Sequence, residues 1–88
     1  MTWKIKYARS AQKTARKIDR KARQRIRDYL EGRVAAMDDP RQLGQPLKGK
    51  FSALWRYRVG DYRVVCELRD ETLVVLVVRI GHRREVYT

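Results

Sequence analysis

The fold is decided by one stretch of the sequence, Trp55-Arg56-Tyr57-Arg58-Val59-Gly60-Asp61-Tyr62-Arg63. Its apolar residues alternate with arginines before Gly60-Asp61, which is the pattern of a strand with one buried face. Gly60-Asp61 suits a two-residue turn, in which the glycine takes a positive φ. Alternation then resumes through residues 62–69. We therefore predict a β-hairpin with Gly60-Asp61 at its tip.

The register of this hairpin places arginines together. With a two-residue turn, Val59 pairs with Tyr62 and Arg58 lies directly opposite Arg63, while Arg56 lies one pleat further along the same face. Like charges directly across a ladder destabilise a sheet, so the pair makes sense if an anion normally sits between them. Guanidinium groups bind phosphate oxygens in a bidentate manner. The alternative is that these arginines are only the solvated face of a one-sided sheet.

The remaining elements are predicted from periodicity. Residues 3–7 alternate as a half-buried strand, and residues 8–18 have helical spacing with Ser10 as a possible cap. A break near Asp19 precedes a second helix over residues 22–37, which Asp38-Asp39-Pro40 ends. Residues 38–52 form a loop. The apolar run 73–78 predicts a central strand after a turn at Asp70-Glu71, and a short last strand is predicted over residues 85–87.

These elements indicate an α+β fold. A strand, a helical hairpin and an antiparallel sheet of three to four strands follow one another, with the helices packed on one face. A chain of 88 residues supports one modest core, so residues 1–88 are predicted to be a single domain. Cys66 lies mid-strand among apolar residues and is interpreted as a core residue.

The net charge of +12 indicates a polyanionic partner, and nucleic acid is the first candidate. An anionic membrane surface, an acidic protein or a merely solvated surface are the alternatives. Residues 1–37 hold 12 basic and 3 acidic residues, a net +9. The sequence lacks a zinc-type cluster, a glycine-rich phosphate loop, a signal peptide and a membrane span, so we expect no metal, no cofactor and a cytoplasmic location.

A polar segment at the end of the chain adds other chemical groups. His82 is the only histidine, and an imidazole can exchange a proton near neutral pH. Arg83 and Arg84 follow it, and Tyr87 can stack on a base or donate a hydrogen bond. On the loop before the hairpin, Lys48 and Lys50 either reach phosphates or are simply solvated.

At this point the sequence resembles the RelE/ParE toxin superfamily, the toxin halves of bacterial type II toxin–antitoxin pairs. The resemblance rests on the basic helical hairpin, Pro46-Leu47-Lys48-Gly49, the stretch from Leu54 to Arg63, and Val78-Arg79-Ile80-Gly81-His82-Arg83-Arg84-Glu85-Val86-Tyr87. The last of these is similar to the RelE branch, and the fold implied is that of RelE-like microbial ribonucleases.

The resemblance implies a ribosome-dependent endoribonuclease that cuts mRNA in the decoding site without a metal ion. The 2′-hydroxyl attacks the adjacent phosphate, and Arg63 and Arg83 stabilise the charged transition state. Arg56 takes a position where relatives often have lysine, and Tyr87 matches a terminal tyrosine that contacts RNA. The implied catalytic residues are Arg63, Arg83, Tyr87, Arg56 and His82. The implied RNA-binding residues are Arg58, Lys48, Lys50, Arg84, Lys13, Lys17, Arg23 and Arg27.

Two departures from the family pattern matter. Leu54 stands where the best-known members have a second lysine, so the general base is left open between His82, Lys48 and Lys50. The chain stops at Thr88, where several relatives continue into a short helix. The implied partners are the ribosome, mRNA and a short antitoxin with a DNA-binding half and a wrapping segment. The alternatives are a non-nucleolytic inhibitor of DNA gyrase, as in the ParE branch, and a degenerate RNA-binding domain.

Overall fold

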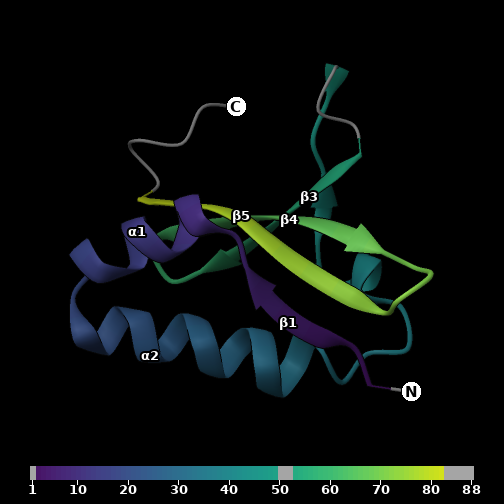
Figure 1. Ribbon diagram of the computed structural model, residues 1–88, viewed down its shortest axis with the longest axis horizontal. Helices are drawn as coiled ribbons and strands as arrows, with labels where there is room; N and C mark the ends of the chain where they lie inside the picture. The colour runs from purple at the N-terminus through teal and green to yellow at the C-terminus, as the bar shows by residue number, and fades with distance from the viewer. Residues whose placement is uncertain (1, 50–52, 83–88) are drawn as a thin grey trace.

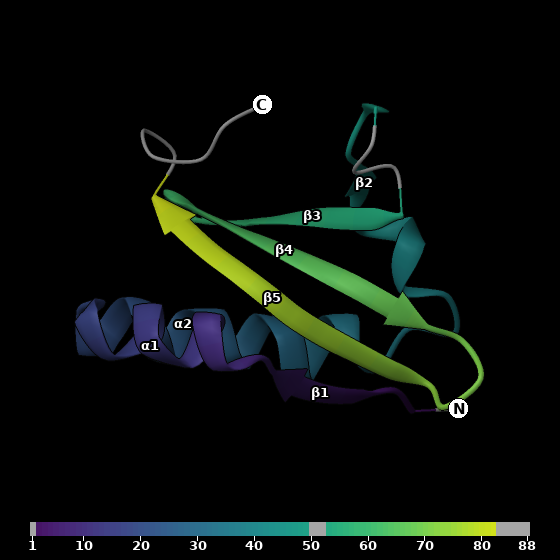
Figure 2. The ribbon, with the colours of Figure 1, turned by 45° about the horizontal axis from the view of Figure 1, so that its top comes forward.

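Five strands form one sheet in the order β1-β5-β4-β3-β2 in the computed structural model, which describes residues 2–49 and 53–82. The strands are β1 (Lys4–Tyr7), β2 (Gln45–Pro46), β3 (Leu54–Val59), β4 (Tyr62–Arg69) and β5 (Val74–His82). Two helices, α1 (Arg9–Lys17) and α2 (Arg20–Tyr29), lie on one face of this sheet (Figures 1 and 2). The predicted α+β class is confirmed.

The predicted hairpin is present with the expected register. β3 and β4 pair antiparallel, with Arg58 opposite Arg63 and Val59 opposite Tyr62. Gly60 has a φ of 59°. Asp61 is not among the described residues with positive φ, which matches a type II′ turn, where only the first central residue needs it.

The apolar run forms a central strand, as predicted. β5 lies between β4, with which it pairs antiparallel, and β1, with which it pairs parallel from Lys4↔Val74 to Tyr7↔Val77. The sheet is therefore mixed, whereas the sequence pattern predicted only antiparallel pairing. The predicted short strand over residues 85–87 lies outside the described residues.

The two helices begin close to their predicted positions, although one cap was predicted wrongly. α1 begins at Arg9, and Ser10 does not cap it. Instead the Ser10 hydroxyl donates a hydrogen bond of 2.8 Å to the carbonyl of Val78, which links α1 to β5. Asp19 caps α2 by accepting a hydrogen bond from the backbone N–H of Ala22.

The segment after α2 differs from the prediction in two ways. A π-helical turn over Leu30–Val34 follows α2, so helical structure ends before Asp38. The predicted loop contains a 3₁₀ turn, Pro40–Gln42, and the short strand β2. Asp39 caps the 3₁₀ turn, since its carboxylate accepts a hydrogen bond of 3.1 Å from the backbone N–H of Arg41.

The core lies between the helices and the inner face of the sheet. Side chains less than 5 % exposed come from α2 and the turn after it and from the central strands; they include Ile26, Leu30, Val34, Tyr57, Val64, Cys66, Val75 and Val77. Cys66 is a buried free thiol, and burial raises its pKa well above the ordinary value. The predicted structural role of Cys66 is therefore confirmed.

Arg41 ties the 3₁₀ turn to the distant β4–β5 turn. Its guanidinium donates two hydrogen bonds, of 2.7 and 3.1 Å, to the carboxylate of Asp70 and one of 3.2 Å to Asp39. It also lies 5.8 Å from the centre of the Trp55 ring. This contact holds the end of the sheet that lies away from the hairpin tip.

The way in which stability falls at acid pH is expected to depend on Asp70. Hydrogen bonding by Arg41 lowers the pKa of Asp70 below its ordinary value of 3.8. A lowered pKa in the folded state stabilises the protein above the ordinary pKa, and this contribution is lost as pH falls through the lowered value. Asp70→Asn should therefore reduce the Tm near neutral pH, and the difference in Tm should shrink as the pH falls through the lowered pKa of Asp70. Glu71→Gln, at the next exposed position, is the control, and an equal pH response of both variants would contradict the assignment.

Candidate nucleic-acid interface

Three arginines share the face of the sheet that the helices leave uncovered. Tyr57 and Val59 are buried against the helices, so strand alternation directs Arg56 and Arg58 to the opposite face, together with Arg63 on β4. We call Arg56, Arg58 and Arg63 the hairpin arginines. Among the described residues, no carboxylate forms an ion pair with any of them. Their positive charge is therefore available to an anion.

A small cavity lies at the hairpin tip. It has a volume of about 130 Å³ and is lined by Arg58, Gly60, Asp61, Tyr62 and Arg63. The Nε of Arg63 is buried and has no hydrogen-bond partner among the described residues. A buried donor without an acceptor costs free energy, and the cost disappears when an acceptor arrives. A phosphate oxygen is one acceptor of the kind that a guanidinium group prefers.

Arg56 is positioned by the neighbouring edge strand. Its guanidinium donates a hydrogen bond of 2.9 Å to the side-chain oxygen of Gln45 on β2. Because that acceptor is neutral, Arg56 is held in place without a carboxylate that would neutralise its charge. Arg56 lies opposite Val65, two residues along β3 from Arg58. The hairpin arginines thus form a row that begins at the tip.

Sequence reasoning missed a fourth guanidinium at this tip. A side-chain carbon placed on Gly60 would meet Nη1 of Arg25 at 3.3 Å, so Arg25 reaches from α2 to the turn. Arg25 lies within the second helix that the sequence predicted, and it was not among the predicted site residues. No local signal predicts the contact, because it depends on how α2 packs against the hairpin.

His82 is not brought onto the face of the hairpin arginines. In the β4–β5 ladder His82 pairs with Tyr62, whereas Arg63 pairs with Gly81. Adjacent pairs point to opposite faces, so His82 lies on the helix side of the sheet. Its ring and the ring of Tyr62 are 5.5 Å apart between centroids, at an interplanar angle of 86°.

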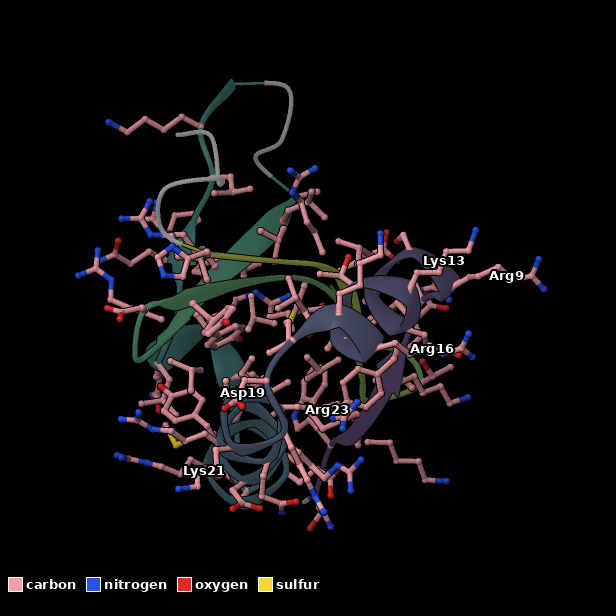
Figure 3. The ribbon with its side chains drawn as sticks, turned by 90° about the vertical axis from the view of Figure 1, so that its left-hand side faces the viewer. Arg9, Lys13, Arg16, Asp19, Lys21 and Arg23 are labelled. Atoms are coloured by element: carbon pink, nitrogen blue, oxygen red, sulfur yellow. The ribbon has the colours of Figure 1, made fainter. Side chains whose placement is uncertain are left out.

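The predicted basic residues of the helices fall into two groups. Lys13 and Lys17 are exposed on α1, and Figure 3 shows Lys13 extending outward beside Arg9 and Arg16. Arg23 instead donates a hydrogen bond of 3.3 Å to the carbonyl of Ala15, near the C-terminus of α1. Arg23 and Arg27 also line a cavity of about 180 Å³ with side chains of α1, β1 and β5.

The loop lysines are separate from the hairpin tip. The backbone N–H of Leu47 donates to the carbonyl of Leu54, so Lys48 lies at the opposite end of β3 from Arg58. Leu54 and Arg58 lie four positions apart along the strand, a distance of roughly 13 Å. Lys50, Arg83, Arg84 and Tyr87, which the sequence also predicted, lie outside the described residues.

Residues 2–49 and 53–82 contain neither a cluster of metal-binding side chains nor a membrane-spanning helix. Within these ranges no three or more His, Cys, Asp or Glu side chains gather where they could hold a metal ion. In the same ranges no helix has the length and apolar character needed to cross a membrane.

Comparison with known protein families agrees with this fold. The model of the family described as "ParE toxin of type II toxin-antitoxin system, parDE" matches residues 5–87. The chain belongs to the RelE/ParE toxin superfamily. The protein is thus a toxin of a type II toxin–antitoxin system, as its resemblance had implied.

Individual relatives of this toxin are distant in sequence. Toxin RelG of Mycobacterium tuberculosis is 22% identical over 87 residues, which cover 99% of this chain and 98% of RelG. The toxin–antitoxin complex RelBE2 of the same organism contains a chain with a TM-score of 0.86 and 20% identity, covering 97% of this chain and 95% of that one. A mutant of Escherichia coli toxin RelE in the free state gives a TM-score of 0.74 at 24% identity, covering 93% of this chain and 84% of RelE. Both structures share the fold of this toxin.

Proposed function

We propose that this toxin is an endoribonuclease that cleaves mRNA in the A site of the ribosome. The observation that carries the proposal is the pair formed by Arg58 and Arg63, which face each other without a carboxylate and line one cavity, together with the unpaired buried Nε of Arg63. Such a site suits a phosphodiester, because guanidinium forks match its oxygens. The similarity to toxins named RelE and RelG supports the same class of target.

In the proposed reaction the 2′-hydroxyl of the RNA loses its proton and attacks the adjacent phosphorus. The bond to the 5′-oxygen breaks, and that oxygen takes up a proton. The products are a 2′,3′-cyclic phosphate and a 5′-hydroxyl. Arg63 and Arg58 bind the non-bridging oxygens, where negative charge increases in the transition state. Arg56 holds the neighbouring phosphate.

Further roles are proposed for residues outside this patch. Arg83 contributes a further positive charge that stabilises the transition state, and Tyr87 contacts a base. The proton of the 2′-hydroxyl is taken by Lys48, Lys50 or His82, the three candidates that the sequence leaves open. We propose that the reaction needs no metal ion.

The other macromolecules that contact the toxin follow from its charge. Lys13, Lys17, Arg27, Arg23 and Arg84 are proposed to contact ribosomal RNA, whose phosphates attract the basic helices. Several similar structures are complexes of a toxin with an antitoxin. We propose a cognate antitoxin for this chain as well, acting in the cytoplasm.

Primer extension tests this function. After induction of the toxin in a bacterial host, translated mRNA should show new 5′ ends within its coding region, while the same transcript without a start codon stays intact. With purified ribosomes, cleavage should need no metal ion other than those that hold the ribosome together. Intact mRNA in growth-arrested cells would overturn the proposal.

A second function is favoured by one observation, the match to the family model described as ParE toxin. A gyrase inhibitor of that kind should stop DNA replication and accumulate covalent gyrase–DNA complexes. One culture distinguishes the two functions if protein synthesis and DNA damage are both followed after induction. Translation arrest should precede DNA damage only if mRNA is the target. A degenerate RNA-binding domain would cause neither effect.

A further inference from the structure

A second cavity adjoins the hairpin tip on the helix side of the sheet. It has a volume of about 300 Å³ and is lined by Thr14, Lys17, Ile18, Tyr62, Gly81 and His82. We call it the ring pocket. Its walls come from α1, from the residue that follows α1, and from the adjoining ends of β4 and β5.

We propose that the ring pocket binds a nucleobase of single-stranded RNA, beside the nucleotide whose phosphate lies at the hairpin arginines. The placement of that phosphate rests on the proposed function. The base itself is inferred from the pocket, which combines two aromatic rings, one lysine and one hydroxyl. Neither the family comparison nor the hairpin arginines assign a role to this pocket.

The rings supply the surface for the base. Tyr62 and His82 are nearly perpendicular, at 86°, with centroids 5.5 Å apart. Two perpendicular rings form a corner, and a flat base fills it by stacking on one ring while its edge meets the other. Every base has a π-face, so aromatic stacking contributes to RNA binding whatever the sequence.

The polar groups of the pocket suit the rest of a nucleotide. Lys17 is exposed at the rim, where its ammonium can meet a phosphate. The hydroxyl of Thr14 already donates a hydrogen bond of 3.1 Å to the carbonyl of Ser10. Its remaining capacity is that of an acceptor, and it can therefore bind an N–H of a base.

Tyr62 connects the ring pocket to the cavity at the hairpin tip, because it lines both. The two cavities are thus separated by no more than one side chain. Arg63 lies next to Tyr62 in β4 and faces the other side of the sheet. A strand of RNA that crosses the end of the sheet can therefore place a phosphate at Arg63 and an adjacent base in the ring pocket.

Proton NMR of the full-length toxin tests the ring pocket directly. The chain has a single histidine, so the imidazole signals belong to His82 alone. Adding 5′-AMP at constant pH should move these signals through the ring current of the base. Ribose 5-phosphate, which carries the same phosphate without a base, should leave them nearly in place.

Variants of matched charge locate the contact. Lys17→Gln should weaken AMP binding about tenfold, since a hydrogen bond to a charged group is lost. Lys21→Gln removes the same charge from an exposed position of α2 outside the pocket, and this variant should bind AMP as the unchanged toxin does. In Tyr62→Phe the His82 signals should still shift when AMP is added, because the ring is kept. In Tyr62→Leu that shift should be lost.

The possible outcomes are distinct. The ring pocket is refuted if ribose 5-phosphate shifts the His82 signals as AMP does, if AMP has no effect, or if the two lysine variants bind equally. If AMP binds as expected but induced toxin leaves mRNA intact, the nuclease function fails and the ring pocket stands. If mRNA is cleaved while AMP leaves His82 unaffected, the reverse holds.

Discussion

Arg63→Ala is expected to reduce cleavage of ribosome-bound mRNA by about a hundredfold to a thousandfold, the usual loss when one preorganised donor to a developing negative charge is removed. The reason is local. Arg63 faces Arg58 across the hairpin, lines the tip cavity and carries the unpaired Nε. The measurement is the rate of cleavage of a programmed ribosome at saturating toxin, together with growth after induction.

Arg69→Ala is the matched control for this prediction. Arg69 lies at the far end of the same strand, six residues from Arg63 and so roughly 20 Å away, and strand alternation puts it on the same face. Its guanidinium pairs with Glu67 and lines no part of the tip cavity. The control should cleave at the unchanged rate. Equal loss in both variants would mean that only net charge matters, and unchanged cleavage by Arg63→Ala would remove the tip as the site.

Tyr57→Ala is expected to lower the free energy of unfolding by about 4 kcal/mol. The total free energy of unfolding of a small domain is only about 5–15 kcal/mol, so the variant is close to unfolding. Tyr57 is completely buried, and its ring lies against the backbone of Gly44, where an added side-chain carbon would come within 2.9 Å of it. Because the backbone around the ring cannot easily close the space, a cavity should remain. Urea denaturation followed by circular dichroism gives the change.

Tyr57→Phe separates packing from hydrogen bonding in the same side chain. The hydroxyl of Tyr57 donates a hydrogen bond of 2.9 Å to the carbonyl of Pro40, so this substitution should cost about 1 kcal/mol. The same bond ties β3, and hence the hairpin arginines, to the 3₁₀ turn. If Tyr57→Ala and Tyr57→Phe lower the free energy of unfolding by similar amounts, the ring contributes little to stability and the packing argument is wrong.

The hairpin could be predicted from the sequence because its signals are local. Alternation in residues 55–59, a Gly-Asp turn and renewed alternation determine both the register and the face on which Arg58 and Arg63 lie. The central position of residues 74–78 was predictable for a similar reason, since an apolar run without alternation needs cover on both faces.

Features that depend on contacts between distant segments could not be predicted in this way. Ser10 has the residue type of a helix cap, but it bonds to Val78, 68 residues away. β2 has only two residues, and it forms because β3 offers an open edge. Nothing around Arg25 indicates that it reaches Gly60.

The candidate site was predicted in part for the same physical reason. Residues on one hairpin share a face by alternation, so Arg56, Arg58 and Arg63 could be grouped from sequence. His82 comes from another strand, and its face depends on the β4–β5 register, which the sequence does not reveal. The roles of these residues remain predictions that the experiments above address.

The parallel pairing of β1 with β5 affects how the toxin folds while the ribosome synthesises it. The first strand made by the ribosome finds its neighbour only after residues 74–77 have been synthesised. Until then the nascent polypeptide lacks the strand to which both β1 and β4 attach. An incompletely translated toxin can therefore pair β2, β3 and β4, but β1 joins the sheet only once β5 has been made.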